Sequence, residues 1–209
     1  MWIAWNIKDT DISWPPRTIE EKVEIFYQRA LGWQLHVADL LANGGQPLGK
    51  SCSVKRLEHS GFAVLQICLS YFETVGHYEQ RNPAPTAKIP KGYFFKEGVR
   101  SVLPQLLARH GEAVFDELVG RLYGGARCGL YHNSMTVPGV GLGQPSGDAP
   151  IGYDSYAKRL AISPERLARA LKVHLEQFRA LLLDPKNVEL RQNFERRFNK
   201  DNGISERES

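Results

Sequence analysis

The sequence has few cysteines, and their spacing is unlike that of a disulfide framework or a zinc site. The 209 residues include three cysteines, Cys52, Cys68 and Cys128, with no Cys-x-x-Cys pair. An odd number of widely spaced thiols argues against a disulfide-stapled miniprotein and against a zinc finger. We interpret the three as buried or incidental thiols and expect no metal or other cofactor.

Long hydrophobic runs are also missing. The most apolar stretch, Phe62–Phe72, is interrupted by Gln66 and Ser70. It is about half as long as the roughly 20 residues that a membrane helix requires. The beginning of the chain lacks the basic region, apolar run and small-residue cleavage site of a secretory signal. From these absences we expect a cytoplasmic protein with no membrane partner.

The excess of positive charge is small. Lys and Arg number 27 against 23 Asp and Glu, which gives a net charge of +4 and a pI near 9.0. Between Ser163 and Lys200 there are nine basic and five acidic residues. The solvated faces of two amphipathic helices explain this more simply than a phosphate-binding surface does. The charge therefore permits an RNA partner without requiring one.

Apolar residues recur at helical spacing through most of the chain. Thr18 and Glu21 form a capping box, and the apolar stripe from Ile19 to Leu40 predicts a long helix that ends near Asn43. A second helix, about Ser60–Tyr78, is apolar on nearly all sides and is expected at the centre of a bundle. Further helices are expected at 93–107 with a kink or restart at Pro104, at 112–122, at 126–133 after Gly124 and Gly125, from Ser163-Pro164 onward, and from Asp184-Pro185 onward.

Two segments are rich in glycine and proline. Arg81–Pro90 contains three prolines and is expected to be irregular, and Val137–Gly152 contains five glycines and three prolines. The glycines of the second segment do not form a phosphate-binding loop, because no apolar strand precedes them and no helix follows. We expect the flanking residues, 134–140 and 153–162, to pair as short strands.

These patterns predict a mainly α protein. We expect one helical domain, 1–209, with an N-terminal arm at 1–17, a loop or β-hairpin insertion at 134–162 and a frayed tail at 201–209. The arm carries Trp2, Trp5 and Trp14, which suit either contact with a larger complex or folding back onto the core.

Arg127 and His132 are the strongest candidates for chemistry. Each of the other five histidines lies near a helical stripe or a helix end, and none pairs with another at metal-ligand spacing. An imidazole, with an ordinary pKa near 6.5, transfers protons at neutral pH, and a guanidinium stabilises the charge that grows on a phosphate. This combination suits cleavage of RNA by its own 2′-hydroxyl, a route that needs no metal.

The spacing of this pair favours a site shared by two subunits. On an α-helix, residues five positions apart point about 140° away from one another, so one copy of Arg127 and His132 makes a poor site. Two copies related by a two-fold axis would bring two cations and two imidazoles to one cleft. Gly129, between them, favours close backbone approach, either at a dimer seam or at a packing contact within the chain.

The segment Arg127-x4-His132 resembles the signature of the HEPN superfamily, the higher eukaryote and prokaryote nucleotide-binding domains. It lies at the end of a helical region and is followed by more helices. Looser similarity extends to Phe72-Glu73, Tyr78-Glu79 and Ile162-Ser163-Pro164, as in bacterial proteins with an Arg-Cys-Gly-Leu-x-His segment.

This resemblance implies a HEPN-like antiparallel helical bundle that forms a homodimer. It also implies a metal-independent endoribonuclease of a toxin–antitoxin, CRISPR-associated or antiphage system, with RNA and an antitoxin or defence protein as partners. By the same resemblance, Arg127 would bind the scissile phosphate and His132 would act as acid, base or orienting group. Independently of the resemblance, Arg121, Tyr131 and Asn133 are candidates for contact with the substrate, and surface positions without a function are the alternative for Arg121 and Tyr131.

Two positions depart from the family pattern. Active members usually have a polar residue after the motif arginine, where this chain has Cys128, a poor hydrogen-bond donor. Ser134 occupies the place of the tyrosine that a nucleotidyltransferase modifies in some members, so an antitoxin of that type is not supported. A noncatalytic HEPN-like module that binds RNA or protein, or acts as a scaffold, is the alternative. A purely structural arrangement also fits, with Arg127 paired to Glu73 or Glu79 and His132 packed at a helix end.

Overall fold

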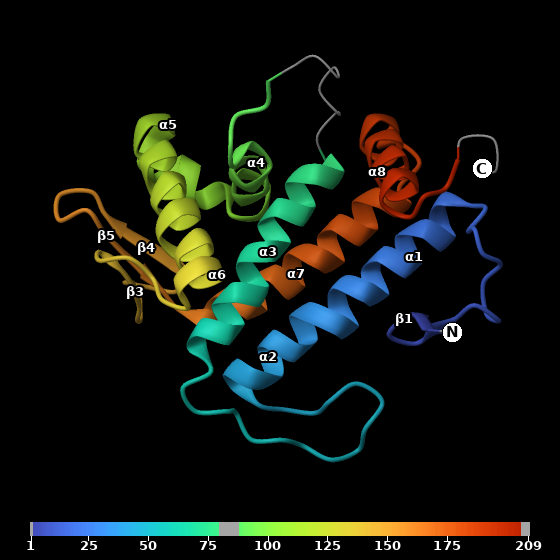
Figure 1. Cartoon of the computed structure of the whole chain (residues 1–209), viewed down its shortest axis with the longest axis horizontal. Coiled ribbons are helices and arrows are strands. Elements are labelled where there is room, and N and C mark those ends of the chain that lie inside the picture. The colour runs from blue at the N-terminus through green and yellow to red at the C-terminus, as the bar shows by residue number, and fades with distance from the viewer. Residues whose placement is uncertain (1, 80–87, 206–209) are drawn as a thin grey trace.

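The computed structural model describes residues 2–79 and 88–205 and is mainly helical, which confirms the predicted fold class at that level (Figure 1). Two π-helical turns, η1 and η2, continue the α-helices that precede them. The helices are α1 Ile19–Ala30, η1 Leu31–Leu35, α2 His36–Asn43, α3 Gly61–Glu79, α4 Tyr93–Val102, α5 Pro104–Arg121, η2 Leu122–Cys128, α6 Gly129–Asn133, α7 Pro164–Leu183 and α8 Val188–Asp201. The strands are β1 Trp2–Ala4, β2 Ile7–Lys8, β3 Val140–Leu142, β4 Ile151–Asp154 and β5 Arg159–Ile162.

The first long helix begins where the capping box predicts. The backbone N–H of Glu21 donates to the Thr18 hydroxyl at 3.2 Å, and the Thr18 N–H donates to the Glu21 carboxylate at 3.2 Å. These bonds satisfy two of the N–H groups that a helix start leaves without partners. The helix then runs through α1, η1 and α2 to Asn43, so the predicted long helix is confirmed with one π-helical turn inside it.

Helix α3 lies at the centre of the helical layer, as its apolar circumference predicts (Figure 1). It contacts α2, α4, α7 and α8, and it supplies the fully buried Tyr71 and Phe72 to the core. Phenylalanines of α4, α5, α7 and α8 complete the core around it: Phe95, Phe115, Phe178, Phe194 and Phe198. No helix in the described residues is both long and apolar enough to cross a membrane.

The C-terminal boundaries differ from the predictions. Asp184-Pro185 does not begin a helix, because the Asp184 N–H still donates to Ala180 and its carboxylate accepts from the Lys186 N–H. That turn ends α7, and α8 begins three residues after Pro185. The part of the predicted frayed tail that is described, 201–205, is held in place, since Ile204 is buried and its N–H donates to Asn199.

Several other predicted boundaries can be compared with the described chain. Pro104 begins α5, which gives the two helical pieces expected around it, and Gly111, at φ 72°, breaks the regular geometry within α5. The tail residues 206–209 and most of Arg81–Pro90, namely 81–87, lie outside the described residues.

The glycine-rich insertion forms a three-stranded sheet in the order β3-β5-β4. The predicted pairing of 134–140 with 153–162 is present at its edge, where Val140 of β3 pairs with Leu160 of β5. The insertion is not a single hairpin, because β3 lies parallel to β5 and the antiparallel partner of β5 is β4. The β4–β5 turn closes on Asp154, whose carboxylate accepts from the backbone N–H groups of Tyr156 and Ala157. An aspartate that bonds to its own following backbone makes such a turn local and stable.

The N-terminal arm folds back onto the helices. Ile3, Ala4 and Ile7 are buried in the core, and the Arg29 Nε–H of α1 donates to the Ile3 carbonyl at 2.7 Å. Trp2 and Trp14 remain about half exposed, at 55% and 44%. Of the two roles considered for the arm, folding back is therefore the one that the structure contains.

A buried histidine makes the stability of this fold depend on pH. His174 of α7 lies against Phe178 and shares a 3.0 Å hydrogen bond with the Tyr71 hydroxyl. Burial lowers the pKa of His174 from 6.5 to about 4. Between these values the unfolded chain binds a proton that the folded chain does not, so stability falls as the pH drops.

We expect the free energy of unfolding to decrease by about 2 to 3 kcal/mol between pH 7.5 and pH 4.5 through this group. Urea unfolding at the two pH values measures the change. His174→Gln keeps a polar partner for Tyr71 and should show a smaller decrease. His59→Asn, at an exposed histidine, is the control and should behave as the wild type. An equal decrease in His174→Gln and the wild type would contradict this origin.

Candidate functional site

The π-helical turn η2 sets the direction of the motif arginine. Tyr123, Arg127 and Tyr131 follow one another at intervals of four residues, so their side chains lie along one side of η2 and α6. Gly125 lets this helix approach the insertion, because a Cβ there would lie 2.8 Å from methyl groups of Val137 and Val140. The two glycines expected to interrupt the helix are therefore included in a widened turn.

Arg127 is held between two tyrosine rings and a carboxylate. Its guanidinium lies 5.6 Å from the ring centres of both Tyr123 and Tyr131, and its Nη2 donates to the Glu73 Oε2 of α3 at 2.9 Å. Burial opposes the positive charge, but the attraction to Glu73 outweighs it and raises the pKa of Arg127. The cation is thus fixed in place and permanently charged.

The Arg127 side chain lines a cavity of about 460 Å³ between five elements of the fold. Helices α1, α3 and α8 form its walls, together with Gln34 of η1 and Arg127 of η2. Among the described residues that line it, three guanidiniums and one imidazole are opposed by two carboxylates. The lining residues are Phe26, Arg29, Ala30, Gln34, Ser70, Glu73, Thr74, His77, Tyr78, Arg127, Arg197 and Asp201.

His132 lies outside this cavity. It is exposed on α6, with its ring edge-on to Tyr131 at a centroid distance of 5.2 Å. One chain therefore does not bring Arg127 and His132 to the same pocket, as the angular argument from their spacing anticipated. The purely structural arrangement predicts that Arg127 pairs with Glu73 or Glu79, and the ion pair with Glu73 is present.

The other candidate residues are dispersed. Arg121 lies 3.6 Å from the Glu117 carboxylate and does not line the Arg127 cavity. Tyr131 contacts Arg127 by its ring, and Asn133 is exposed at the end of α6. Gly129 makes a close packing contact within the chain, because a Cβ there would lie 2.6 Å from the Met135 carbonyl oxygen.

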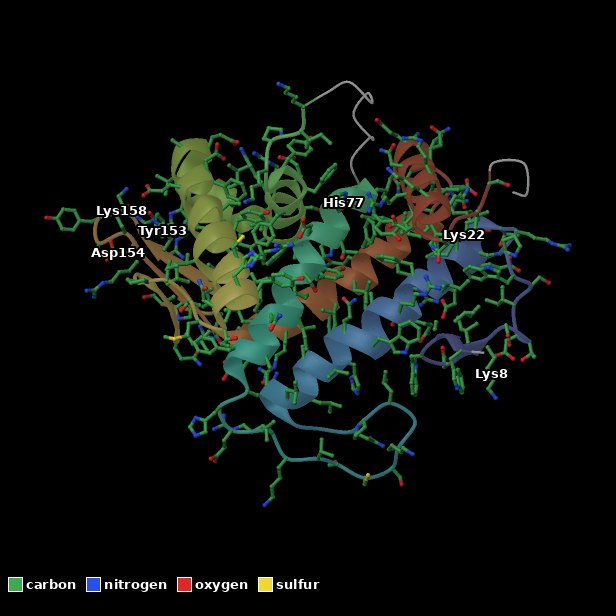
Figure 2. All side chains as sticks on the ribbon, viewed as in Figure 1. Lys8, Lys22, His77, Tyr153, Asp154 and Lys158 are labelled. Carbon is green, nitrogen blue, oxygen red and sulfur yellow. The ribbon has the colours of Figure 1, made fainter. Side chains whose placement is uncertain are left out.

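His77 is a residue of the cavity that reasoning from the sequence did not select. It lies near the end of α3, where that helix faces α4 and α8 (Figure 2). Its ring stacks on Phe94 at 3.9 Å, and its Nδ1 lies 3.1 Å from the Arg197 Nη1. Glu73 and His77 are four residues apart on a helix, and this spacing was the signal that could have placed His77 beside the partner of Arg127.

The described residues, 2–79 and 88–205, contain no group of three or more His, Cys, Asp or Glu side chains that could hold a metal ion. Comparison of the chain with protein-family models, with curated proteins and with solved structures found no match. The interpretation of the site therefore rests on the chemistry of its own residues.

Proposed function

We propose that the protein is a metal-independent endoribonuclease of HEPN type, a helical bundle that acts on RNA as a homodimer. One observation carries the proposal: the Arg127 guanidinium is held by Glu73, Tyr123 and Tyr131 at the wall of a cavity in which cations outnumber carboxylates. Such a surface suits a phosphodiester. A role in defence or toxin–antitoxin systems follows from the resemblance of the Arg127-x4-His132 segment, and a cytoplasmic location is part of the same proposal.

The reaction requires a cation and two proton transfers. The substrate 2′-oxygen attacks phosphorus while the bond from phosphorus to the 5′-oxygen breaks, leaving a 2′,3′-cyclic phosphate and a 5′-hydroxyl. One group accepts the proton of the 2′-hydroxyl, and another donates a proton to the departing oxygen. We assign stabilisation of the pentacoordinate phosphate to Arg127 and the proton transfers to His132 of the two subunits.

The surface around His132 fits contact with a second copy of the chain. Tyr131 and Met135, close to His132 in the chain, are 68% and 64% exposed. Met135 also lines a hollow with the exposed Val137 and Leu142. Exposed apolar side chains gathered near a candidate site favour burial in an interface. A symmetric contact there would bring each His132 toward the site of the partner.

Incubation with labelled RNA in EDTA tests the activity. We expect cleavage that persists in the chelator and yields cyclic phosphate and 5′-hydroxyl ends. Sedimentation analysis under the same conditions should give the mass of two chains. Products with 3′-hydroxyl ends, or activity that EDTA abolishes, would contradict the proposal.

A noncatalytic module that binds RNA or a partner protein is the second candidate. The Arg127–Glu73 ion pair favours a noncatalytic module, because the carboxylate of Glu73 explains the position of the arginine without a catalytic role. Cys128 favours it also, since this residue replaces the polar group usual in active members of the family. RNA binding without cleavage in the assay above would support this function.

A further inference from the structure

The cavity beside Arg127 contains two more arginines that the motif does not include. Arg29 comes from α1 and Arg197 from α8, so two helices and η2 direct three guanidiniums to one space of about 460 Å³. Pockets of 300 to 1,000 Å³ are of the size that small ligands occupy. The arginines are far apart in the sequence, and folding alone brings them together.

The partners of these arginines leave a net positive charge. Within the described residues, Arg29 donates to two neutral acceptors, the Ile3 carbonyl at 2.7 Å and the Asn202 amide oxygen at 2.8 Å. Arg197 donates from Nε to Asp201 at 2.8 Å, and the Arg127 guanidinium bonds to Glu73. The two carboxylates therefore do not balance the three guanidiniums, and the cavity attracts an anion.

The contact of Arg197 with His77 fixes the tautomer of the imidazole. A guanidinium has no acceptor, so the Arg197 Nη1 must donate to Nδ1 of His77 across the 3.1 Å contact. The Nδ1 atom then carries no proton, and the neutral ring holds its hydrogen on Nε2. Burial and the charge of Arg197 both lower the pKa of His77, in keeping with a neutral ring. His77 thus contributes an N–H donor without a further charge.

We propose that this cavity is a phosphate-binding subsite within one subunit, in which Arg197, Arg29 and the Nε2–H of His77 join Arg127. The ligand is a phosphate group of the RNA strand, so this assignment rests on the proposed function. Several guanidiniums around one cavity suit phosphate, because each planar fork matches two phosphate oxygens. The subsite would fix the strand in one subunit while His132 of the dimer completes the reaction.

Binding of an RNA that cannot be cleaved tests the subsite. Fluorescence anisotropy with a labelled 2′-O-methyl oligonucleotide should show an affinity roughly tenfold lower for Arg197→Gln than for the wild type. Arg197→Lys should lie between the two. Arg196→Gln is the matched control, because Arg196 is the exposed neighbour on α8, carries the same charge and does not line the cavity. Circular dichroism verifies that each variant is folded.

The outcomes separate this inference from the proposed function. Wild-type affinity in Arg197→Gln, with weaker binding in Arg127→Gln, overturns the subsite and leaves the nuclease proposal standing. If the wild type binds no RNA, the proposed function fails, and inorganic phosphate then decides the subsite by NMR of the His77 ring. Phosphate-dependent shifts that disappear in Arg197→Gln support it, and unchanged shifts in the wild type overturn it.

Discussion

Replacing Arg127 by glutamine should lower the rate of metal-independent RNA cleavage by about 100- to 1,000-fold, the loss typical when one preorganised donor to a developing oxyanion is removed. Glutamine keeps an N–H donor but ends two bonds short of the Nη2 atom that bonds to Glu73, so circular dichroism must accompany the assay to separate the missing charge from a collapsed cavity. Single-turnover cleavage of end-labelled RNA in EDTA measures the rate of the chemical step.

The companion variants decide which residues act with Arg127. His132→Asn should lose activity by a similar factor, because the proposal assigns proton transfer to this exposed imidazole. Arg169→Gln removes the same charge from an exposed position on α7 and should cleave at the wild-type rate. Full activity in His132→Asn alongside an inactive Arg127→Gln would contradict the assignment of the pair.

The helices could be predicted from the sequence because their signals are local. The Thr18 capping box, the Ser163 cap and the apolar stripes each involve residues within one or two turns of one another. The π-helical turns were not predicted, because the widening of η2 at Gly125 depends on its approach to Val137 and Val140 from the insertion. The parallel pairing of β3 with β5 is likewise set by tertiary contacts, and no local rule gives it.

The candidate site could be predicted only in part for the same reason. The Arg127-x4-His132 motif is a local pattern that can be read from the sequence, and the structural alternative predicts Glu73 as a partner of Arg127. The cavity could not be predicted from the sequence, because Arg29, His77 and Arg197 meet Arg127 from separate helices. The spacing of Glu73 and His77 places His77 on the same side of α3 as the partner of Arg127, but it gives no sign of Arg29 and Arg197, which come from other helices.

The position of His77 depends on an unusually close contact between α3 and α4, and this contact leads to the second large effect. A Cβ on Gly76 would lie 1.8 Å from the Phe94 carbonyl oxygen, and a Cβ on Gly98 would lie 1.7 Å from the Phe72 carbonyl oxygen. The obstacles are backbone atoms of the facing helix, which cannot rotate away as a side chain does. The two helices must therefore move apart if either glycine gains a methyl group.

We expect Gly98→Ala to lower the free energy of unfolding by at least about 3 kcal/mol, since overpacking against backbone leaves no local relief. For a chain of this size that corresponds to a decrease in Tm of about 6 to 12 °C, which calorimetry would detect. Gly76→Ala should have a similar effect, because the contact is reciprocal. In Gly76→Ala the His77 ring would also move relative to Phe94, so its NMR signals should shift.

Gly120→Ala is the matched control for this contact. Gly120 lies exposed within α5, and a Cβ there would meet no atom within 4 Å, so alanine should instead stabilise the protein by about 0.5 to 1 kcal/mol through its higher helix propensity. Equal and small changes in Gly98→Ala and Gly120→Ala would show that α3 and α4 are not in backbone contact. In that event the contact between α3 and α4 would not hold the His77 ring against Phe94, and His77 would not have a fixed place in the wall of the cavity.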